Sequence, residues 1–228
     1  MDIILVPGLW LAASSWDDVT PALAATSHRA HPLTLPGVGE PDSDIGMDDW
    51  VAAVVARIDA LGGPVVLVGH SGGGNVVWGA ADARPDRVAR VIFVDTAPPP
   101  PGFPIGEFEV VDGVVPFPGW DFFDEPDVRD LDDATRARTA PMAKSVPARV
   151  PADPIVLRST ARFAVPVTLL MGGHDKESME EELANWGPFA DEFHAIQDAE
   201  VVTLGSGHWP QFSMPERLAE AIITAVDR

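Results

Sequence analysis

The sequence contains no cysteine, and this absence excludes several kinds of chemistry. The chain forms no disulfide, carries no thiolate nucleophile and offers no cysteine ligand to a metal. The motifs H-E-x-x-H, G-x-G-x-x-G and G-x-x-x-x-G-K-[ST] are missing as well, so no zinc-protease, dinucleotide or nucleoside-triphosphate signature is present. We therefore expect neither a metal nor an organic cofactor.

Positive charge is also scarce. Lys and Arg number 15 against 35 Asp and Glu, which gives a net charge of −20 and a surface that repels phosphate backbones. Apolar runs are too short to cross a bilayer, and the first residues lack the basic segment of a signal peptide. These features predict a cytoplasmic protein without nucleic-acid or membrane partners, and both a monomer and a homodimer stay open.

Short apolar runs alternate with helical patterns along the 228 residues. The runs that predict strands are residues 3–6, 30–35, 65–68, 88–94, 165–171 and 200–204, and the patterns that predict helices are residues 47–61, 75–83, 180–186 and 216–226. This alternation predicts an α/β protein with a mostly parallel central sheet flanked by helices.

Residues 98–160 break the alternation. They contain twelve of the 23 prolines and five of the ten phenylalanines, whereas disordered segments are usually poor in aromatic residues. We therefore expect a structured excursion over one edge of the sheet, inserted into a core of residues 1–97 and 161–228. Because ligands of open α/β sheets bind beyond the carboxyl ends of strands, the excursion is expected to cover the site.

The decisive motif is G-x-S-x-G, formed by residues 69–73 between a predicted buried strand and a predicted helix. A serine in this position sits on a sharp turn, with its hydroxyl exposed at the end of the sheet. Gly69 and Gly73 allow the strand and the helix to approach each other. The motif predicts Ser71 as a nucleophile.

A serine hydroxyl needs a base, and histidine is suited to neutral pH. His208 follows the last predicted strand, so the order nucleophile, acid, histidine favours it among the six histidines. Two carboxylates follow strands and could orient it. We favour Asp175, which follows a glycine-rich loop, over Asp95, for which a supporting role is the alternative.

The tetrahedral intermediate of acyl transfer needs two backbone N–H donors. One is expected from Gly72, directly after the nucleophile. The other is expected from Leu9 in the loop after the first strand, because Pro7 has no N–H.

Taken together, residues 5–10, 69–73, 172–175 and 207–210 resemble the α/β-hydrolase superfamily, over nearly the whole chain. The chain is most similar to small-cap serine esterases of the methyl-ester esterase and hydroxynitrile lyase group. One departure is Pro7, where many members carry histidine. The resemblance implies the α/β-hydrolase fold, with residues 98–160 as the small cap (lid) that the family inserts after its sixth strand.

The implied activity is hydrolysis of small carboxylic esters, with lactones as an extension, through an acyl-enzyme on Ser71. The substrate pocket is expected to be apolar, and its predicted lining is Trp10, His70, Phe117, Trp120, Phe123 and Trp209. Two alternatives stay open: a non-catalytic receptor for a small ligand, and a cofactor-free lyase of the hydroxynitrile lyase type. The lyase chemistry adds a lysine near the base, and neither Lys144 nor Lys176 lies in the His208 segment.

Overall fold

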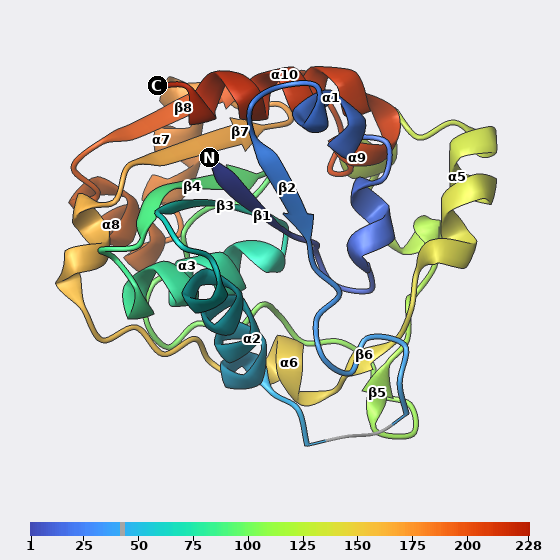
Figure 1. The fold of residues 1–228 in the computed structure, drawn as a ribbon. Coiled ribbons are helices and arrows are strands. Elements are labelled where there is room, and N and C mark those ends of the chain that lie inside the picture. The colour runs from blue at the N-terminus through green and yellow to red at the C-terminus, as the bar shows by residue number, and fades with distance from the viewer. Residues whose placement is uncertain (42–43) are drawn as a thin grey trace.

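A six-stranded sheet forms the centre of the protein in a computed structural model, which describes residues 1–41 and 44–228. The strand order is β2-β1-β3-β4-β7-β8, and every neighbouring pair is parallel, which confirms the predicted fold class (Figure 1). The strands are β1 (Asp2–Val6), β2 (Arg29–Pro32), β3 (Val65–His70), β4 (Val88–Val94), β7 (Val167–Met171) and β8 (Ala199–Thr203).

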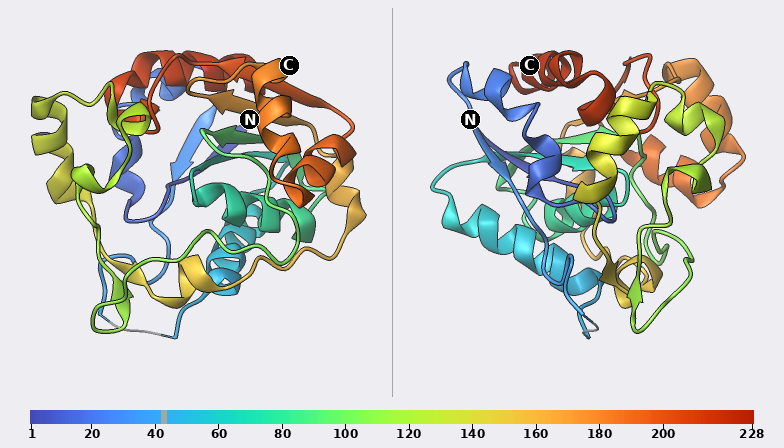
Figure 2. Two further views of the ribbon diagram at one scale, coloured as in Figure 1. Left: turned by 180° about the vertical axis from the view of Figure 1, so that it is seen from behind. Right: turned by 90° about the vertical axis from the view of Figure 1, so that its right-hand side faces the viewer.

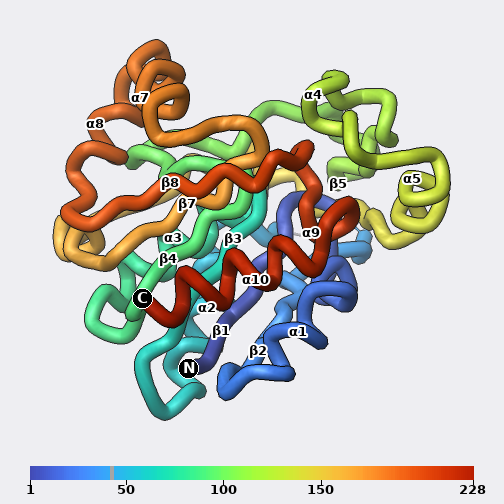
Figure 3. The backbone as a smooth tube through the Cα atoms, turned by 90° about the horizontal axis from the view of Figure 1, so that it is seen from above, coloured from blue at the N-terminus to red at the C-terminus, as the bar shows by residue number. Residues whose placement is uncertain are grey.

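Helices cover both faces of the sheet, because successive strand side chains point to opposite sides. In β1, Ile4 and Val6 pack in the cluster that holds α2 and α3, whereas Ile3 and Leu5 pack in the cluster that holds α10. Figure 3 shows α10 lying across the strands. The helices of the core are α1 (Thr20–Ala24), α2 (Met47–Ala60), α3 (Gly73–Ala83), α7 (Lys176–Ala184), α8 (Pro188–Ala195), α9 (Pro210–Ser213) and α10 (Pro215–Val226), with 3-10 turns at Ala13–Trp16 and Thr160–Ala164. Over the described chain, none of them combines the length and apolarity needed to cross a membrane.

The excursion predicted between the fourth and fifth strands is ordered. It leaves after β4, the fourth strand along the chain, and wraps the side of the sheet toward which the strand arrows point (Figures 1 and 2). Its elements are short: β5 (Val114–Val115) pairs antiparallel with β6 (Val146–Pro147), and the helices are α4 (Glu125–Val128), α5 (Asp133–Thr139) and α6 (Arg149–Ala152), with 3-10 turns at Trp120–Phe122 and Ala140–Met142. The division into a core and a cap at residues 98 and 160 stays a prediction.

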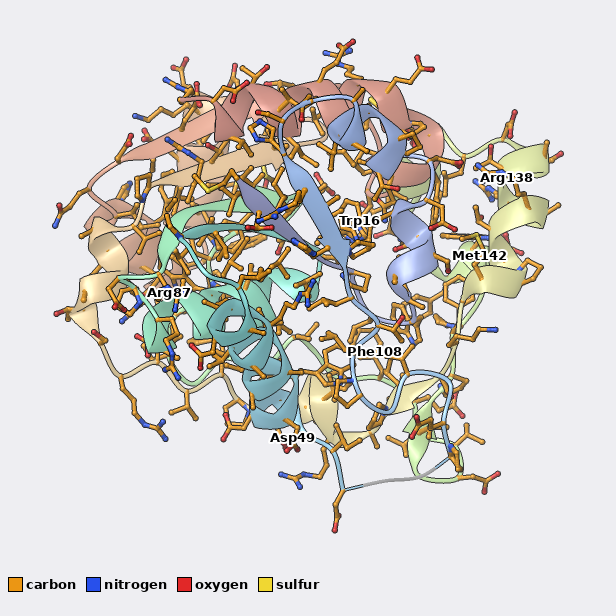
Figure 4. The ribbon with its side chains drawn as sticks, in the orientation of Figure 1. Trp16, Asp49, Arg87, Phe108, Arg138 and Met142 are labelled. Atoms are coloured by element: carbon orange, nitrogen blue, oxygen red, sulfur yellow. The ribbon has the colours of Figure 1, made fainter. Side chains whose placement is uncertain are left out.

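One ion pair attaches this excursion to the core, and a buried cluster of charges lies just beyond its C-terminal end. Arg138 on α5, labelled at the periphery in Figure 4, lies 3.1 Å from Asp18. Arg162, which is 4% exposed, bonds to Glu192 of α8 at 2.7 Å and to Asp82 of α3 at 3.3 Å. Because a buried charge is stable only when it is paired, this second cluster fixes where the chain re-enters the sheet.

Candidate active site

Ser71 occupies the turn that joins β3 to α3. Its φ is +50°, a left-handed conformation that non-glycine residues rarely adopt outside functional sites. The two flanking glycines are required by close approach, since a Cβ on Gly69 would lie 2.6 Å from the Gly73 carbonyl oxygen and one on Gly73 would lie 2.5 Å from the Pro7 oxygen. The predicted nucleophile elbow therefore has the geometry that its glycines indicated.

His208 lies in the loop after β8, as the chain order predicted, and its ring contacts Asp95. Nδ1 of His208 is 2.6 Å from Oδ2 of Asp95, and Oδ1 of Asp95 accepts the backbone N–H of Gly172 at 2.7 Å. Burial, the largest single influence, raises the pKa of Asp95, but these hydrogen bonds and the attraction of His208 together hold that pKa below its usual value. Asp95 thus stays a carboxylate that orients the imidazole.

The predicted pairing of His208 with Asp175 is wrong. Asp175 is exposed and caps the N-terminus of α7, where its Oδ1 accepts the backbone N–H of Ser178 at 2.9 Å. Hydrogen bonds from the backbone N–H of Ser178, which has the largest effect, and from its hydroxyl lower the pKa of Asp175 and hold its side chain at the start of α7. The same cap explains why α7 begins at Lys176, four residues before the predicted start.

Ser71 and His208 line one cavity of about 180 Å³, which we call the aromatic chamber. Its walls also contain Trp10, Phe108, Phe123 and Trp209. Because Nδ1 of His208 bonds to Asp95, Nε2 is the ring nitrogen that can accept a proton. Among the described residues no hydrogen bond joins Ser71 to the ring, and such bonds are often long before substrate binds.

The two predicted oxyanion donors lie side by side. A Cβ on Gly72 would be 3.2 Å from Cγ of Leu9, and both residues are buried next to Ser71. Neither backbone N–H has a hydrogen-bond acceptor within the part of the chain that the structure describes, although buried N–H groups are normally paired. Two unpaired donors beside a serine hydroxyl are what an oxyanion requires.

The comparison with known families agrees with this geometry. A model of the "Alpha/beta hydrolase family" matches residues 3–221. The chain belongs to the alpha/beta hydrolase family. The resemblance inferred from the motifs is thereby confirmed.

Several of the proteins similar to this chain are named as hydrolases or esterases. A pyrethroid hydrolase from Sphingobium wenxiniae is 28% identical, and the match covers 99% of this chain and 88% of the relative. Esterase PIR7B from Oryza sativa is 36% identical over 42% of this chain and 38% of its own length. Among solved structures, a methylesterase from Arabidopsis shares the fold with a TM-score of 0.76 at 21% identity, covering 100% of this chain and 99% of that one.

The aromatic side chains of this alpha/beta hydrolase divide into an inner and an outer layer. Of the predicted pocket residues, Trp10, His70, Phe123 and Trp209 line the aromatic chamber. The prediction that Phe117 and Trp120 line the pocket is wrong, because both pack behind its walls. The ring centroid of Phe117 lies 5.8 Å from that of Trp10, and the ring centroid of Trp120 lies 5.0 Å from that of Trp209. Three further residues line the chamber although the sequence did not predict them there: Gly8, Ile105 and Phe108.

His70 is a structural support beneath the site. It is 1% exposed, its Nε2 bonds to the His208 carbonyl oxygen at 2.8 Å, and its Nδ1 lies 3.2 Å from Nε2 of Gln211. Burial, followed by the proximity of the His208 ring, lowers the pKa of His70 to about 3. The ring is therefore neutral, with Nε2–H donating to the carbonyl and Nδ1 accepting from the amide.

We expect His70 to make the fold acid-sensitive. In the unfolded chain the imidazole gains a proton near pH 6.5, whereas in the folded chain it does so only near pH 3, so acid favours unfolding over that interval. When the pH is lowered from 7 to 5, the free energy of unfolding measured in urea should fall by about 2 kcal/mol more for the wild type than for His70→Gln. A difference that is the same at both pH values would contradict the neutral buried ring.

Residues at the end of α4 and directly after it hold the His208 loop at three points. The backbone N–H of His208 donates to the Asp127 carbonyl oxygen at 2.7 Å, and that of Gly207 donates to Oδ2 of Asp130 at 2.8 Å. Arg129 donates from Nη2 to the Ser206 carbonyl oxygen at 2.7 Å. We call residues 127–130 the clamp, because they fix the loop that carries the predicted base.

Removing one arm of the clamp should slow turnover. Asp130→Ala leaves the Gly207 N–H without its acceptor and frees the loop, so kcat on a p-nitrophenyl ester should fall roughly 10- to 100-fold with little change in KM. Asp133→Ala, an exposed carboxylate in the first turn of α5, is the control and should keep the wild-type kcat. Equal kcat values for the two variants would show that the clamp does not position His208.

Proposed function

We propose that this alpha/beta hydrolase is a serine esterase that cleaves small carboxylic esters through an acyl-enzyme on Ser71. The observation that carries the proposal is the Asp95–His208 bond in the same chamber as the left-handed Ser71. The ester-hydrolysing relatives support the reaction class.

In the proposed mechanism, Ser71 attacks the ester carbonyl while His208 accepts the hydroxyl proton. Asp95 stabilises the imidazolium that forms, and the N–H groups of Leu9 and Gly72 bind the oxyanion. The protonated His208 then gives its proton to the leaving alcohol, which departs and leaves the acyl group on Ser71. A water molecule activated by His208 releases the acid and restores the serine. Lactones fit the same steps.

None of these steps needs a metal or a cofactor. Across residues 1–41 and 44–228 no group of three or more histidine and acidic side chains is placed to hold a metal ion. The chain's two lysines, Lys144 and Lys176, line neither the aromatic chamber nor the second cavity beside Ser71, which disfavours the lyase alternative.

Hydrolysis of p-nitrophenyl butyrate tests the proposal. We expect saturable release of nitrophenol by the wild type and none above background by a Ser71→Ala variant. Binding of small esters without turnover would instead support a receptor, and release of cyanide from a cyanohydrin would support the lyase.

A further inference from the structure

A second cavity, of about 400 Å³, opens on the other side of Ser71. It shares Ser71 and Ile105 with the aromatic chamber, so the two cavities meet at the serine. Ile105 lines both cavities and packs against the turn beside Ser71, where a Cβ placed on Gly72 would lie 2.9 Å from its Cδ1. An ester bound at Ser71 therefore places its two halves in two different surroundings.

Asn75 marks this second cavity as a polar one. It lies in the first turn of α3, is 7% exposed and lines the cavity wall. Its amide makes no hydrogen bond among residues 1–41 and 44–228, and its nitrogen and oxygen are not among the fully buried side-chain atoms that lack a partner. The amide of a largely buried residue that stays accessible from the nucleophile's cavity is a group that a ligand can bind.

The charged side chains of the cavity are acidic. Asp127 and Glu182 line it with Asp95, and no Lys or Arg does so within the described chain. Its one basic side chain, His174, bonds to Glu182 at 3.1 Å. Among the described residues the Asp127 carboxylate forms no ion pair, and burial, as the largest influence, raises its pKa against the opposing attraction of His208. We call this cavity the acidic chamber.

Aromatic rings complete its walls. Trp186 is 48% exposed although it lines the chamber, and Phe189 lies beside it with ring centroids 5.7 Å apart. Aromatic rings next to carboxylates attract organic cations, because the ring face carries negative charge. The acidic chamber thus combines hydrogen-bond acceptors, negative charge and aromatic rings.

We propose that the acidic chamber binds the half of the ester that carries a protonated amine, while the aromatic chamber binds an apolar half. The inference rests on the proposed esterase function and names its substrate class. Asn75 accepts a hydrogen bond from the ammonium group, Asp127 supplies the opposite charge, and an anionic group in the same position is repelled.

Three p-nitrophenyl esters with the same chain length and different terminal charge test this class. They are the 6-(dimethylamino)hexanoate, which is cationic at pH 7, the 7-methyloctanoate, its neutral isostere, and the pimelate monoester, which is anionic. At low salt we expect kcat/KM to be at least tenfold higher for the cation than for the isostere, and lower for the anion than for both. The cation preference should shrink in high salt, which screens partly exposed charges.

Two variants should reduce the ratio of kcat/KM for the cationic ester to that for its isostere. Asp127→Asn removes the charge but leaves the backbone carbonyl that holds His208, and Asn75→Leu removes the acceptor. Glu177→Gln, an exposed carboxylate on α7 outside the chamber, is the matched control and should keep the wild-type ratio.

The three esters distinguish a failure of the cation-binding inference from a failure of the esterase function. Ser71-dependent hydrolysis of the isostere without a preference for the cation, or a preference that Asp127→Asn leaves intact, would overturn the inference and leave the esterase function standing. Failure of all three esters to be hydrolysed would overturn both.

Discussion

Replacing Ser71 with alanine should lower kcat on p-nitrophenyl butyrate by roughly 10⁴- to 10⁶-fold, because it removes the hydroxyl on which the acyl-enzyme forms. The residual rate reflects binding and the oxyanion donors alone. Fold and stability should change little, since alanine keeps the Cβ of serine at the same left-handed φ. Steady-state nitrophenol release and a thermal unfolding midpoint measure both quantities.

Ser27→Ala provides the matched control for this variant. Ser27 is exposed in a turn and lies outside both chambers, so its replacement should keep the wild-type kcat. A Ser71→Ala protein that is folded and retains more than one hundredth of the wild-type rate would show that another group attacks the ester.

Asp95→Asn should have the second largest effect, a loss of roughly 10³- to 10⁴-fold in kcat. An amide in this position no longer stabilises the imidazolium, and it favours the wrong tautomer of His208, because its NH₂ group donates where the carboxylate accepted. The measurement is kcat/KM for the same ester at a series of pH values, with circular dichroism to verify folding.

Asp175→Asn is the control for the same chemical change at the other carboxylate. Asparagine is as good a helix cap as aspartate, so α7 should remain capped and kcat/KM should stay within about threefold of wild type. The reverse ranking of the two variants would restore Asp175 as the orienting acid and contradict the geometry.

Most of the fold was predictable because buried strands and amphipathic helices have characteristic patterns of apolar residues. β3 and β4 are largely buried runs rich in Val, and α10 carries one apolar face, so their positions follow from composition and periodicity. The boundaries were less predictable. β2 ends at Pro32 rather than at residue 35, since it is an edge strand held by β1 alone.

The choice between the two carboxylates depended on a distance that the sequence does not encode. Asp95 directly follows the last residue of β4, while Asp175 stands four residues beyond the end of β7. The extra residues, including Gly172 and Gly173, carry the chain away from the site and into the start of α7. The position of Asp95 directly after its strand was the signal that favoured it, but the prediction gave more weight to the glycine-rich loop before Asp175.

The sequence predicted an apolar pocket with aromatic walls but did not show which aromatic residues line it. Aromatic residues of the excursion do build its walls, but their side chains follow no helix or strand period there, so nothing separated the lining Phe123 and Phe108 from Phe117 and Trp120 behind them. Ile105 was not predicted because an isolated isoleucine between Pro104 and Gly106 carries no pattern. The acidic chamber combines residues of α3, α4, β7, α7, α8 and the segment after β4 that only the folded chain brings together.

If Ser71 is the one activated nucleophile of this hydrolase, a reagent that reacts covalently with activated serines should modify it and no other residue. The protein is treated with a fluorophosphonate probe, and its intact mass and peptides are measured. We expect one adduct per chain, on the peptide that contains Ser71, and none on the Ser71→Ala variant. An unlabelled wild type, or an adduct on any other residue, would contradict the account.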